Sequence, residues 1–455
     1  MFMTLKSQSE ILSDFAVSLK LNDIPIDVLN TAKFCIIDTI GVSIFGSQFP
    51  WSQKIATYAK SYGSGGKSQV LGSTNTRLHA PYAALVNGAF AHAFEQDSLR
   101  KPGAGVHPGA TLFPPALAIG QEMSVGGETL LRSFIAGCEV MFRIGSASKH
   151  SSEKLGFHAP GLTGVFGAAV SAGLVQGLDS LQLSNALGIA GSLSSGLLAF
   201  TKSTRGSEVK RLHLGKACES GVLASRLAYE GFEGPETILE GKFGFLDTFC
   251  SSSDSELLTK NLGTEWETSK ICLKAYPCHI TAHPLIHSLY LLMNKYSFSS
   301  IDIQRCDLLV SEKILTHHDI REPRDIKQAQ YSVPFCLAIA MDNDASDPSV
   351  FREEIVNNPN IVNNCKKITM TAYSDALQRN SWTSTLKVLL KNGSEYIVES
   401  DGFVGSPENP LSISQLKQRF LHHTQKCKFV NAENWFNAFL DLENLTNLNQ
   451  LPDLF

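Results

Sequence analysis

Two histidines of this sequence stand in short segments rich in glycine and proline. His107 lies in KPGAGVHPGATLFPP, and His158 lies in GFHAPG. Such segments are typical of loops, and loops held by a rigid scaffold often carry function. An imidazole titrates near neutral pH, so both side chains suit proton transfer. Each histidine alone fits a solvated loop residue equally well.

Four cations fall within residues 202–211: Lys202, Arg205, Lys210 and Arg211, with His213 just beyond them. They follow a stretch, 180–201, that contains no charged residue. At the mouth of an apolar core, such a group would attract a polycarboxylate. A solvated basic turn explains the same pattern.

A second candidate segment is KAYPCHITAHPLIH, which runs from Lys274 to His287. His279, His283 and His287 are spaced four apart, so one helical face could present three imidazoles to a metal. No carboxylate is near in sequence, however, and Pro284 suits the first turn of a helix. We therefore favour a helix entry with His279 at its N-terminal end, where an anion is stabilised. No metal and no cofactor are predicted.

The segment AHAFEQDS, residues 91–98, follows a helix of small residues and contains Glu95 and Asp97. Two carboxylates this close repel each other and shift each other's pKa, as paired catalytic acids do. The same pattern is also common at the hydrophilic end of a helix.

The composition limits the class of protein. The chain has 455 residues, of which 43% are hydrophobic and 18% charged, which excludes a disordered chain. A net charge of −4 argues against a nucleic-acid binder. The ten cysteines include no C-x-x-C pair, so clustered thiolate ligands for zinc or iron–sulfur are not expected.

Segments 155–178 and 180–201 lack charge, but glycine, serine and glutamine interrupt them, so we predict buried helices and no membrane span. Residues 1–15 contain no apolar run typical of a signal peptide. The expected location is the cytoplasm.

Periodicity predicts the fold that must position these residues. Ser9 is a candidate cap for a first helix, and helical patterns cover 128–145 and 216–231. After about residue 268, strands over 303–310 and 366–373 and a hairpin at Asn392 and Gly393 alternate with helices over 283–293, 331–341 and 350–356. Helix returns at 412–447. The fold class is mostly α with an α+β second domain: helical domain 1–267, α+β lid 268–404, and C-terminal helices 405–455 that dock back on the helical domain.

Ordered blocks along most of the chain resemble the MmgE/PrpD family. They include IIDTIGVSIFG (36–46), VNGAFAHAFEQD (86–97), HPGATLFPPALAIGQ (107–121), KAYPCHITAHP (274–284) and AQYSVPFCLAIA (329–340). The resemblance implies a large helical domain, a smaller α+β lid, a homodimer and an active site in the cleft between the domains. It also implies metal-independent chemistry on a small polycarboxylate.

The resemblance also implies roles for individual residues. His107 matches the family's proton-transferring loop histidine, His158 its GFH histidine, and Lys210 the lysine of its K-x-L-H block. Lys274 and His279 match its K-x-x-P-x-H pair. We predict that His107, Lys210, His158 and Glu95 are catalytic, and we predict five substrate-binding residues: Lys274, His279, Asp97, Lys101 and His213.

The sequence departs from the family pattern D-F-D-D-T, because it reads Glu95-Gln96-Asp97-Ser98-Leu99. Glu95 replaces the first aspartate and Leu99 replaces a threonine, so the substrate does not carry over. The next two residues, Arg100 and Lys101, either bind an extra carboxylate or are solvated.

Known members of the family are 2-methylcitrate dehydratase, cis-aconitate decarboxylase and iminodisuccinate epimerase. They share a need to handle a proton or a carbanion beside a carboxylate. The leading hypothesis is a lyase of the 2-methylcitrate dehydratase type, a hydro-lyase of propionate catabolism. The alternatives are an epimerase, a decarboxylase, and a dimer that binds carboxylates without catalysis.

Overall fold

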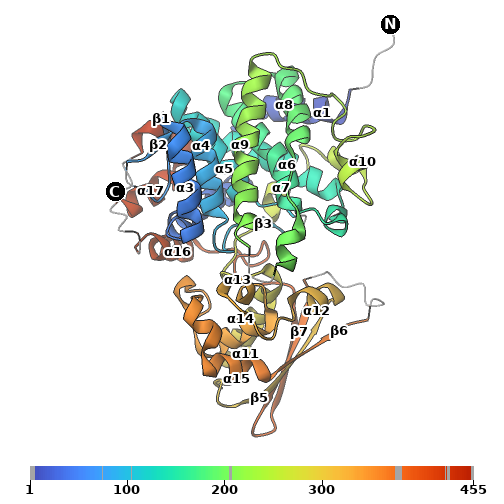
Figure 1. The fold of residues 1–455 in the computed structure, drawn as a ribbon, viewed down its shortest axis with the longest axis vertical. Coiled ribbons are helices and arrows are strands. Elements are labelled where there is room, and N and C mark those ends of the chain that lie inside the picture. Colours follow the sequence, from blue (N-terminus) through green and yellow to red (C-terminus); the bar gives the residue numbers. More distant parts are fainter. Residues whose placement is uncertain are drawn as a thin grey trace.

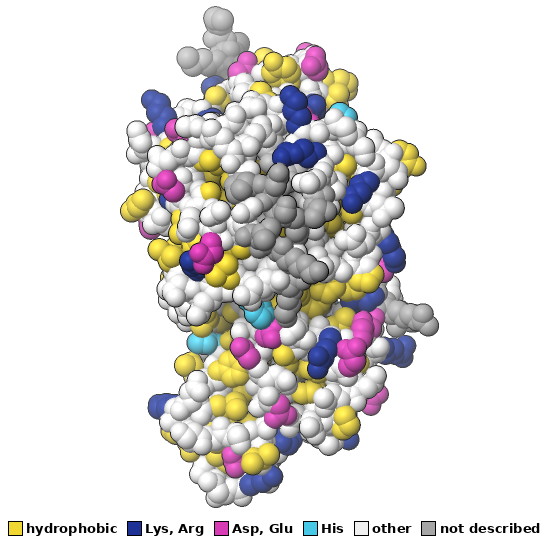
Figure 2. Space-filling view, turned by 90° about the vertical axis from the view of Figure 1, so that its left-hand side faces the viewer, with side chains coloured by type: hydrophobic (Ala, Val, Ile, Leu, Met, Phe, Trp, Pro, Cys, Tyr) yellow, Lys and Arg dark blue, Asp and Glu magenta, His cyan; other side chains and the backbone are white. Residues whose placement is uncertain are grey.

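The predicted fold class, mostly α with a second α+β domain, is confirmed. We describe a computed structural model of the chain, which describes residues 6–73, 75–103, 105–203, 207–374, 382–425, 427 and 431–451. The larger, helical domain and the smaller domain lie one below the other in Figure 1, and in Figure 2 the outline narrows where they meet. Histidine side chains reach the surface at this waist (Figure 2).

Ten helices between residues 8 and 249, with the last two of the chain, make up the described core of the larger domain. They are α1 (Gln8–Ser18), α2 (Ile26–Gly46), α3 (Pro50–Gly63), α4 (Ala80–Ala91), α5 (Pro108–Met123), α6 (Gly127–Ala147), α7 (Ala159–Gln176), α8 (Ser180–Leu193), α9 (Val209–Tyr229), α10 (Phe245–Phe249), α16 (Ile413–Gln425) and α17 (Ala432–Leu440). Two short strand pairs accompany them: β1 (Ser64–Gln69) with β2 (Arg77–Leu78), and β3 (Leu99–Arg100) with β4 (Ile271–Cys272).

The smaller domain packs helices on a sheet with the order β6-β5-β7-β8. Its strands are β5 (Ile303–Val310), β6 (Ile368–Ala372), β7 (Ser384–Leu390) and β8 (Glu395–Ser400), and its helices are α11 (His283–Tyr296), α12 (Glu312–His318), α13 (Ile326–Ala329), α14 (Val333–Asp342) and α15 (Pro359–Lys366). Asn392 and Gly393 join β7 to β8 in the predicted hairpin, with Leu386 opposite Val398.

Two local predictions were wrong. Ser7, not Ser9, caps the first helix: its hydroxyl accepts from the Glu10 amide while the Glu10 carboxylate accepts from the Ser7 amide. This reciprocal capping box satisfies two orphan amides, which Ser9 inside the helix cannot do. The segment 350–356 forms only a 3₁₀ turn, Glu353–Asn357, because Pro359 keeps the preceding Asn358 extended.

The C-terminal helices pack on the helical domain. Gly41 of α2 leaves room for Phe420 of α16, since a Cβ at Gly41 would lie 3.2 Å from the Phe420 ring. Phe420 and Trp435 belong to the same buried core as the N-terminal helices. The domain limits at 267/268 and 404/405 stay predictions.

Two helices, α2 and α7, are long and apolar enough by length and composition to cross a membrane. Their apolar windows are 78% and 94% buried inside the protein. The surface that would face lipid is therefore occupied by other helices of the same core, as expected for apolar helices of a large helical domain.

Close contact between α4 and α9 sets the spacing of the site, because α4 leads into Glu95 and α9 carries Lys210. A Cβ at Gly215 would lie 2.4 Å from the Leu85 carbonyl oxygen, and a Cβ at Gly88 would lie 2.6 Å from Cys218 Sγ. Any larger residue at these positions would push the helices apart.

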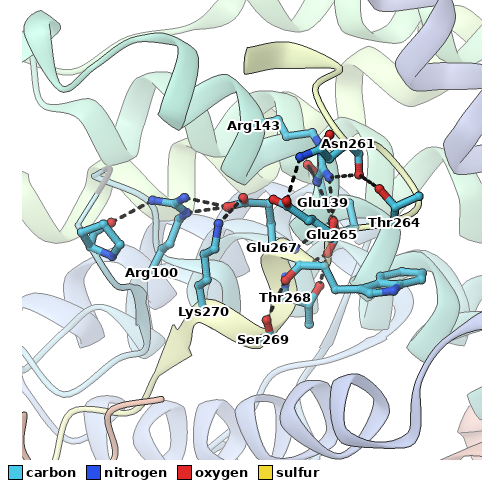
Figure 3. A network of polar contacts seen from close by, with 12 residues as sticks. Arg100, Glu139, Arg143, Asn261, Thr264, Glu265, Glu267, Thr268, Ser269 and Lys270 are labelled. Atoms are coloured by element: carbon cyan, nitrogen blue, oxygen red, sulfur yellow. Dashed lines mark hydrogen bonds and ion pairs between the residues drawn. The ribbon is translucent and has the colours of Figure 1, made fainter. Parts of the chain in front are cut away.

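A buried polar network fixes the chain just beyond the site loop (Figure 3). Glu139 of α6 accepts from the Thr268 amide at 2.8 Å and pairs with Arg143 at 2.5 Å. Glu267 in turn pairs with Arg100 of β3 at 2.7 Å. Because β3 pairs with β4, this network holds the end of the Glu95–Leu99 loop beside the segment that carries Lys274.

Candidate active site

Glu95 is buried between two lysines that come from different parts of the chain. Its Oε1 pairs with Lys210 Nζ, and its Oε2 lies 3.3 Å from Lys274 Nζ. Burial alone would raise the pKa of the Glu95 carboxyl, but the two ammonium groups hold that pKa well below its usual range. Burial lowers the pKa of Lys210 in spite of this pairing. The three groups form a buried cationic centre with one excess positive charge.

The backbone at Glu95 is left-handed, with φ of 57°. This conformation costs a non-glycine residue about 1–2 kcal/mol. Strain of this kind is concentrated at functional sites, where surrounding contacts hold it in place. Here the contacts are the two ion pairs of the carboxylate, which fix its position between the lysines.

Asp97 holds two imidazoles with one oxygen. Its Oδ2 lies 2.9 Å from His92 Nδ1 and 2.7 Å from His107 Nδ1. Burial would raise the pKa of Asp97, yet the two imidazoles hold it well below its usual range. The hydrogen bond with Asp97 puts the proton of the neutral His92 ring on Nδ1, because a carboxylate only accepts hydrogen bonds. The ion-pair contact of the same oxygen with His107 Nδ1 leaves Nε2 of His107 for proton transfer.

His158 is the third imidazole of this cluster, and His213 is its partner. Their Nδ1 atoms lie 2.9 Å apart, so one ring donates and the other accepts. Burial, together with Lys210, holds the pKa of His158 well below its usual range, and burial lowers that of His213. His213 also lines a surface pocket of about 400 Å³ with Phe200. The pair therefore links the buried cluster to the protein surface.

The smaller domain contributes an aromatic and an imidazole. The Tyr331 hydroxyl lies 3.5 Å from Glu95 Oε1, and its ring lies 4.8 Å from Lys210 Nζ. The ring of His279 lies 5.2 Å from Tyr331 and stacks on His318 at 4.1 Å. Burial holds the pKa of Tyr331 well above and that of His279 well below the usual ranges, so both side chains are neutral at pH 7.

Several site residues sit at helix starts. His107 is the cap of α5, His158 is the cap of α7, and Lys210 is the second residue of α9. His279 caps a 3₁₀ turn, Ile280–Ala282, that leads into α11, which agrees with the predicted helix entry. The amides and dipoles of helix N-termini favour an anion at this place and disfavour a protonated imidazole.

All predicted site residues except Lys101 meet in this cluster. Lys101 Nζ instead lies 3.0 Å from Glu408 Oε2 and 3.0 Å from the Asp401 carbonyl oxygen. Arg100 is likewise paired with Glu267, so neither cation of this loop is solvated. The role of Lys101 in substrate binding stays a prediction. Arg205 lies outside the described residues.

The structure adds two residues that the sequence did not single out. His92 is fully buried, its Nδ1 is hydrogen-bonded to Asp97, and its ring centre lies 6.4 Å from that of His158. Its pKa is lowered by burial to about 4. Tyr331 comes from the block AQYSVPFCLAIA. Both stand in segments that resemble the family, and this resemblance is the sequence signal that could have identified them.

The donor atoms of His92, Asp97 and His107 lie within 4.8 Å of one another, close enough for three ligands of one metal ion. Two imidazoles and a carboxylate suit a transition metal. The same distances fit a hydrogen-bonded pair of imidazoles around one carboxylate. The expectation of metal-independent chemistry stays a prediction, which a chelator tests below.

A large helical domain, a smaller α+β domain and a buried cluster of imidazoles, lysines and carboxylates together define a two-domain protein with a candidate acid–base site. The chain belongs to the MmgE/PrpD family: residues 10–258 match the model of its N-terminal domain, and residues 276–435 match that of its C-terminal domain. The predicted family is confirmed.

Several relatives match nearly end to end. The chain is 26% identical to a cis-aconitate decarboxylase of Mus musculus, over 99% of this chain and 94% of that protein. It is 27% identical to one of Aspergillus terreus, over 97% and 94% of the two proteins. A cis-aconitate decarboxylase-like protein of Aspergillus oryzae is 30% identical over 67% of each.

Proposed function

We propose that this protein is a lyase that acts on a small tricarboxylate, and that decarboxylation of the cis-aconitate type is its reaction. The observation that carries the proposal is the buried Lys210–Glu95–Lys274 centre beside the Asp97–His107 pair. The similarity to cis-aconitate decarboxylases along the whole chain supports decarboxylation over the hydro-lyase that the sequence favoured.

In decarboxylation, the bond between a substrate carbon and one carboxylate breaks. Carbon dioxide leaves, the electron pair stays on carbon, and a proton then joins the carbanion. Lys210 and Lys274 stabilise the charge that spreads into a neighbouring carboxylate. His107 in its imidazolium form gives the proton from Nε2 to the carbanion, is left as the neutral ring with a proton on Nδ1, and takes up a proton from solvent before the next turnover. Asp97 orients the ring and stabilises its imidazolium form.

Dehydration of 2-methylcitrate is the second candidate. It uses the same base and the same lysines, but it also needs an acid for the departing hydroxyl. Tyr331 keeps its proton at pH 7, because burial holds its pKa well above the usual range, and its hydroxyl lies 3.5 Å from Glu95 Oε1. The same shift makes this hydroxyl a weak acid, which ranks dehydration second. Epimerisation needs only the proton transfers, and the predicted non-catalytic dimer needs none.

The test is a panel of cis-aconitate, citrate and 2-methylcitrate with purified protein, followed by proton and carbon NMR in D₂O. Decarboxylation predicts release of carbon dioxide and one deuterium in the product, and His107→Ala should abolish both. Dehydration would yield an unsaturated acid that keeps every carboxylate. The rate with a chelator should equal the rate without it, and loss of the rate would point to a metal on His92, Asp97 and His107.

Deuterium exchange without a net reaction would favour the epimerase. Binding without exchange or turnover would favour the non-catalytic carboxylate-binding protein. A homodimer in the cytoplasm, without a nucleic-acid or membrane partner, completes the proposal, and sedimentation of the purified protein tests the dimer.

A further inference from the structure

We propose that Arg211, together with Lys327 and Trp51, forms a separate subsite for one carboxylate of the substrate, and that this subsite makes the protein select tricarboxylates over dicarboxylates. The inference rests on the proposed function and names the substrate class of the same site. We call these three residues the Trp51 subsite.

Arg211 is a buried charge without an anion. It is 3% exposed, and its Nη2 has no hydrogen-bond partner. Its Nε and Nη1 reach only two carbonyl oxygens, those of Ala93 at 3.4 Å and Ser207 at 3.5 Å. The part of the chain that the structure describes gives this guanidinium no carboxylate in ion-pair contact. A buried charge is costly unless it is paired, so a ligand anion is the expected partner.

The surroundings of Arg211 are cationic and aromatic. Its guanidinium carbon lies 5.7 Å from the centre of the Trp51 ring, and Lys327 Nζ of α13 lies 5.9 Å from that ring. Trp51 is itself fixed, because its Nε1 donates to the Ala93 carbonyl oxygen at 3.2 Å. The helical domain therefore supplies Arg211, and the smaller domain supplies a second cation on the same ring.

The Trp51 subsite adjoins the lysine centre but is distinct from it. Arg211 follows Lys210 on α9, so the two side chains diverge by about 100° around the helix axis. Arg211 Nε reaches the Ala93 carbonyl oxygen at 3.4 Å, two residues before Glu95, so the guanidinium lies beside the segment that carries Glu95 of the lysine centre. Two anchors that diverge from one helix turn suit two carboxylates of one small molecule.

The charges explain the selectivity for a third carboxylate. Lys210 and Lys274 share the Glu95 carboxylate, so their pair retains one positive charge for a ligand. Lys327 is only loosely paired, with Asp325 at 3.8 Å. Of these four cations, Arg211 is the one without a carboxylate in ion-pair contact among the described residues, and its planar fork can bind a carboxylate through two parallel hydrogen bonds. In the proposed reaction one carboxylate leaves as carbon dioxide and a second lies at the lysine centre, so the third carboxylate is the one that this fork binds. A dicarboxylate bound in the reacting position leaves the fork unfilled.

Isothermal titration with two non-reacting probes tests the proposal. Tricarballylate carries three carboxylates, and glutarate has the same two ends without the central one. The wild-type protein should bind tricarballylate more tightly than glutarate. Arg211→Gln should lower the affinity for tricarballylate by at least about 30-fold, the usual effect of losing one partner of a buried charged pair. The same substitution should lower the affinity for glutarate by less than about threefold, since the long-range effect of one lost charge is screened by salt.

Two variants serve as controls. Arg226→Gln removes another arginine of α9, one that pairs with Glu122 and is exposed, and it should leave both affinities unchanged. Arg211→Lys keeps the charge but not the fork, and it should weaken tricarballylate by about tenfold. This variant answers the question if Arg211→Gln fails to fold. Equal weakening of both probes, or no weakening, overturns the Trp51 subsite.

The results that would refute the proposed subsite differ from those that would refute the proposed lyase activity. If Arg211→Gln removes the preference for tricarballylate but the wild-type protein turns over no tricarboxylate, the subsite stands and the lyase does not. If the wild-type protein decarboxylates cis-aconitate and Arg211→Gln changes neither KM nor the affinity for tricarballylate, the lyase stands and the subsite is wrong.

Discussion

Asp97 Oδ2 lies 2.7 Å from His107 Nδ1, and this contact decides which nitrogen of His107 does chemistry. We expect Asp97→Asn to keep the shape of the site but to lower turnover by about 10⁴-fold, because an amide can donate to Nδ1 and stabilise the wrong tautomer. The affinity for tricarballylate should change little. Steady-state kinetics and titration check the two effects.

The matched control is Asp347→Asn. Asp347 pairs with His422 at 3.0 Å on the surface, so this substitution breaks another carboxylate–imidazole contact away from the site. It should leave turnover unchanged. Equal losses in both variants would mean that Asp97 acts through general stability and not through His107.

A second prediction concerns proton uptake on binding. Burial lowers the pKa of His92 to about 4 and holds that of His158 well below its usual range, so both are neutral in the empty site at pH 7. An arriving polycarboxylate raises these pKa values, because a nearby anion favours the protonated ring. Binding of tricarballylate should therefore take up protons. Calorimetric titration at pH 7 in phosphate and in Tris, which differ in ionisation enthalpy, measures the number of protons taken up per ligand bound. Zero uptake would show that binding does not protonate these histidines.

The same histidines make stability depend on pH. A folded-state pKa below the unfolded value of about 6.5 means that the unfolded chain binds more protons between pH 6.5 and 4. The free energy of unfolding should therefore fall as the pH is lowered through this window. Chemical denaturation of the wild-type protein and of His92→Gln measures it, and the variant should show the shallower dependence. A flat profile in the wild-type protein would show that these imidazoles are not buried in neutral form.

Local sequence signals predicted the elements well where one short segment decides the structure. Asn392 and Gly393 specify their hairpin by themselves. The cap at Ser7 was missed because Ser7 and Ser9 stand close enough together to be candidate caps of one helix, and only Ser7 has a glutamate three residues later. The short turn was missed because Pro359 keeps Asn358 extended. Periodicity gives the type of element more reliably than its ends.

The site was predictable only through the family resemblance, since its contacts join distant parts of the chain. Lys101 shows the limit: its partner Glu408 is 307 residues away, and no local pattern announces that pair. His92 was missed because it directly follows an alanine-rich helix, where any buried residue would give the same sequence pattern. The sequence placed Arg211 in a basic cluster, but only the structure shows that its Nη2 has no hydrogen-bond partner.

Another prediction tests the positioning of His158 by His213. Their Nδ1 contact at 2.9 Å fixes which nitrogen of His158 faces the site. We expect His213→Ala to lower kcat by about tenfold, which is typical when a supporting hydrogen bond is lost. In a double-mutant cycle with His158→Ala, the second substitution should add almost nothing. Additive effects would show that His213 acts independently, for example on the substrate as the sequence predicted.

The last prediction tests the spacing of α4 and α9. In Gly215→Ala, the new Cβ would lie 2.4 Å from the Leu85 carbonyl oxygen, so the helices must separate. We expect a loss of about 1–3 kcal/mol in the free energy of unfolding, as for other overpacked cores. Lys210 should also move from Glu95, which lowers turnover. Gly402→Ala is the control, since its Cβ would meet only Ser400 Oγ at 3.8 Å, and it should change neither quantity. Unchanged turnover in Gly215→Ala would mean that this helix contact supports the fold alone.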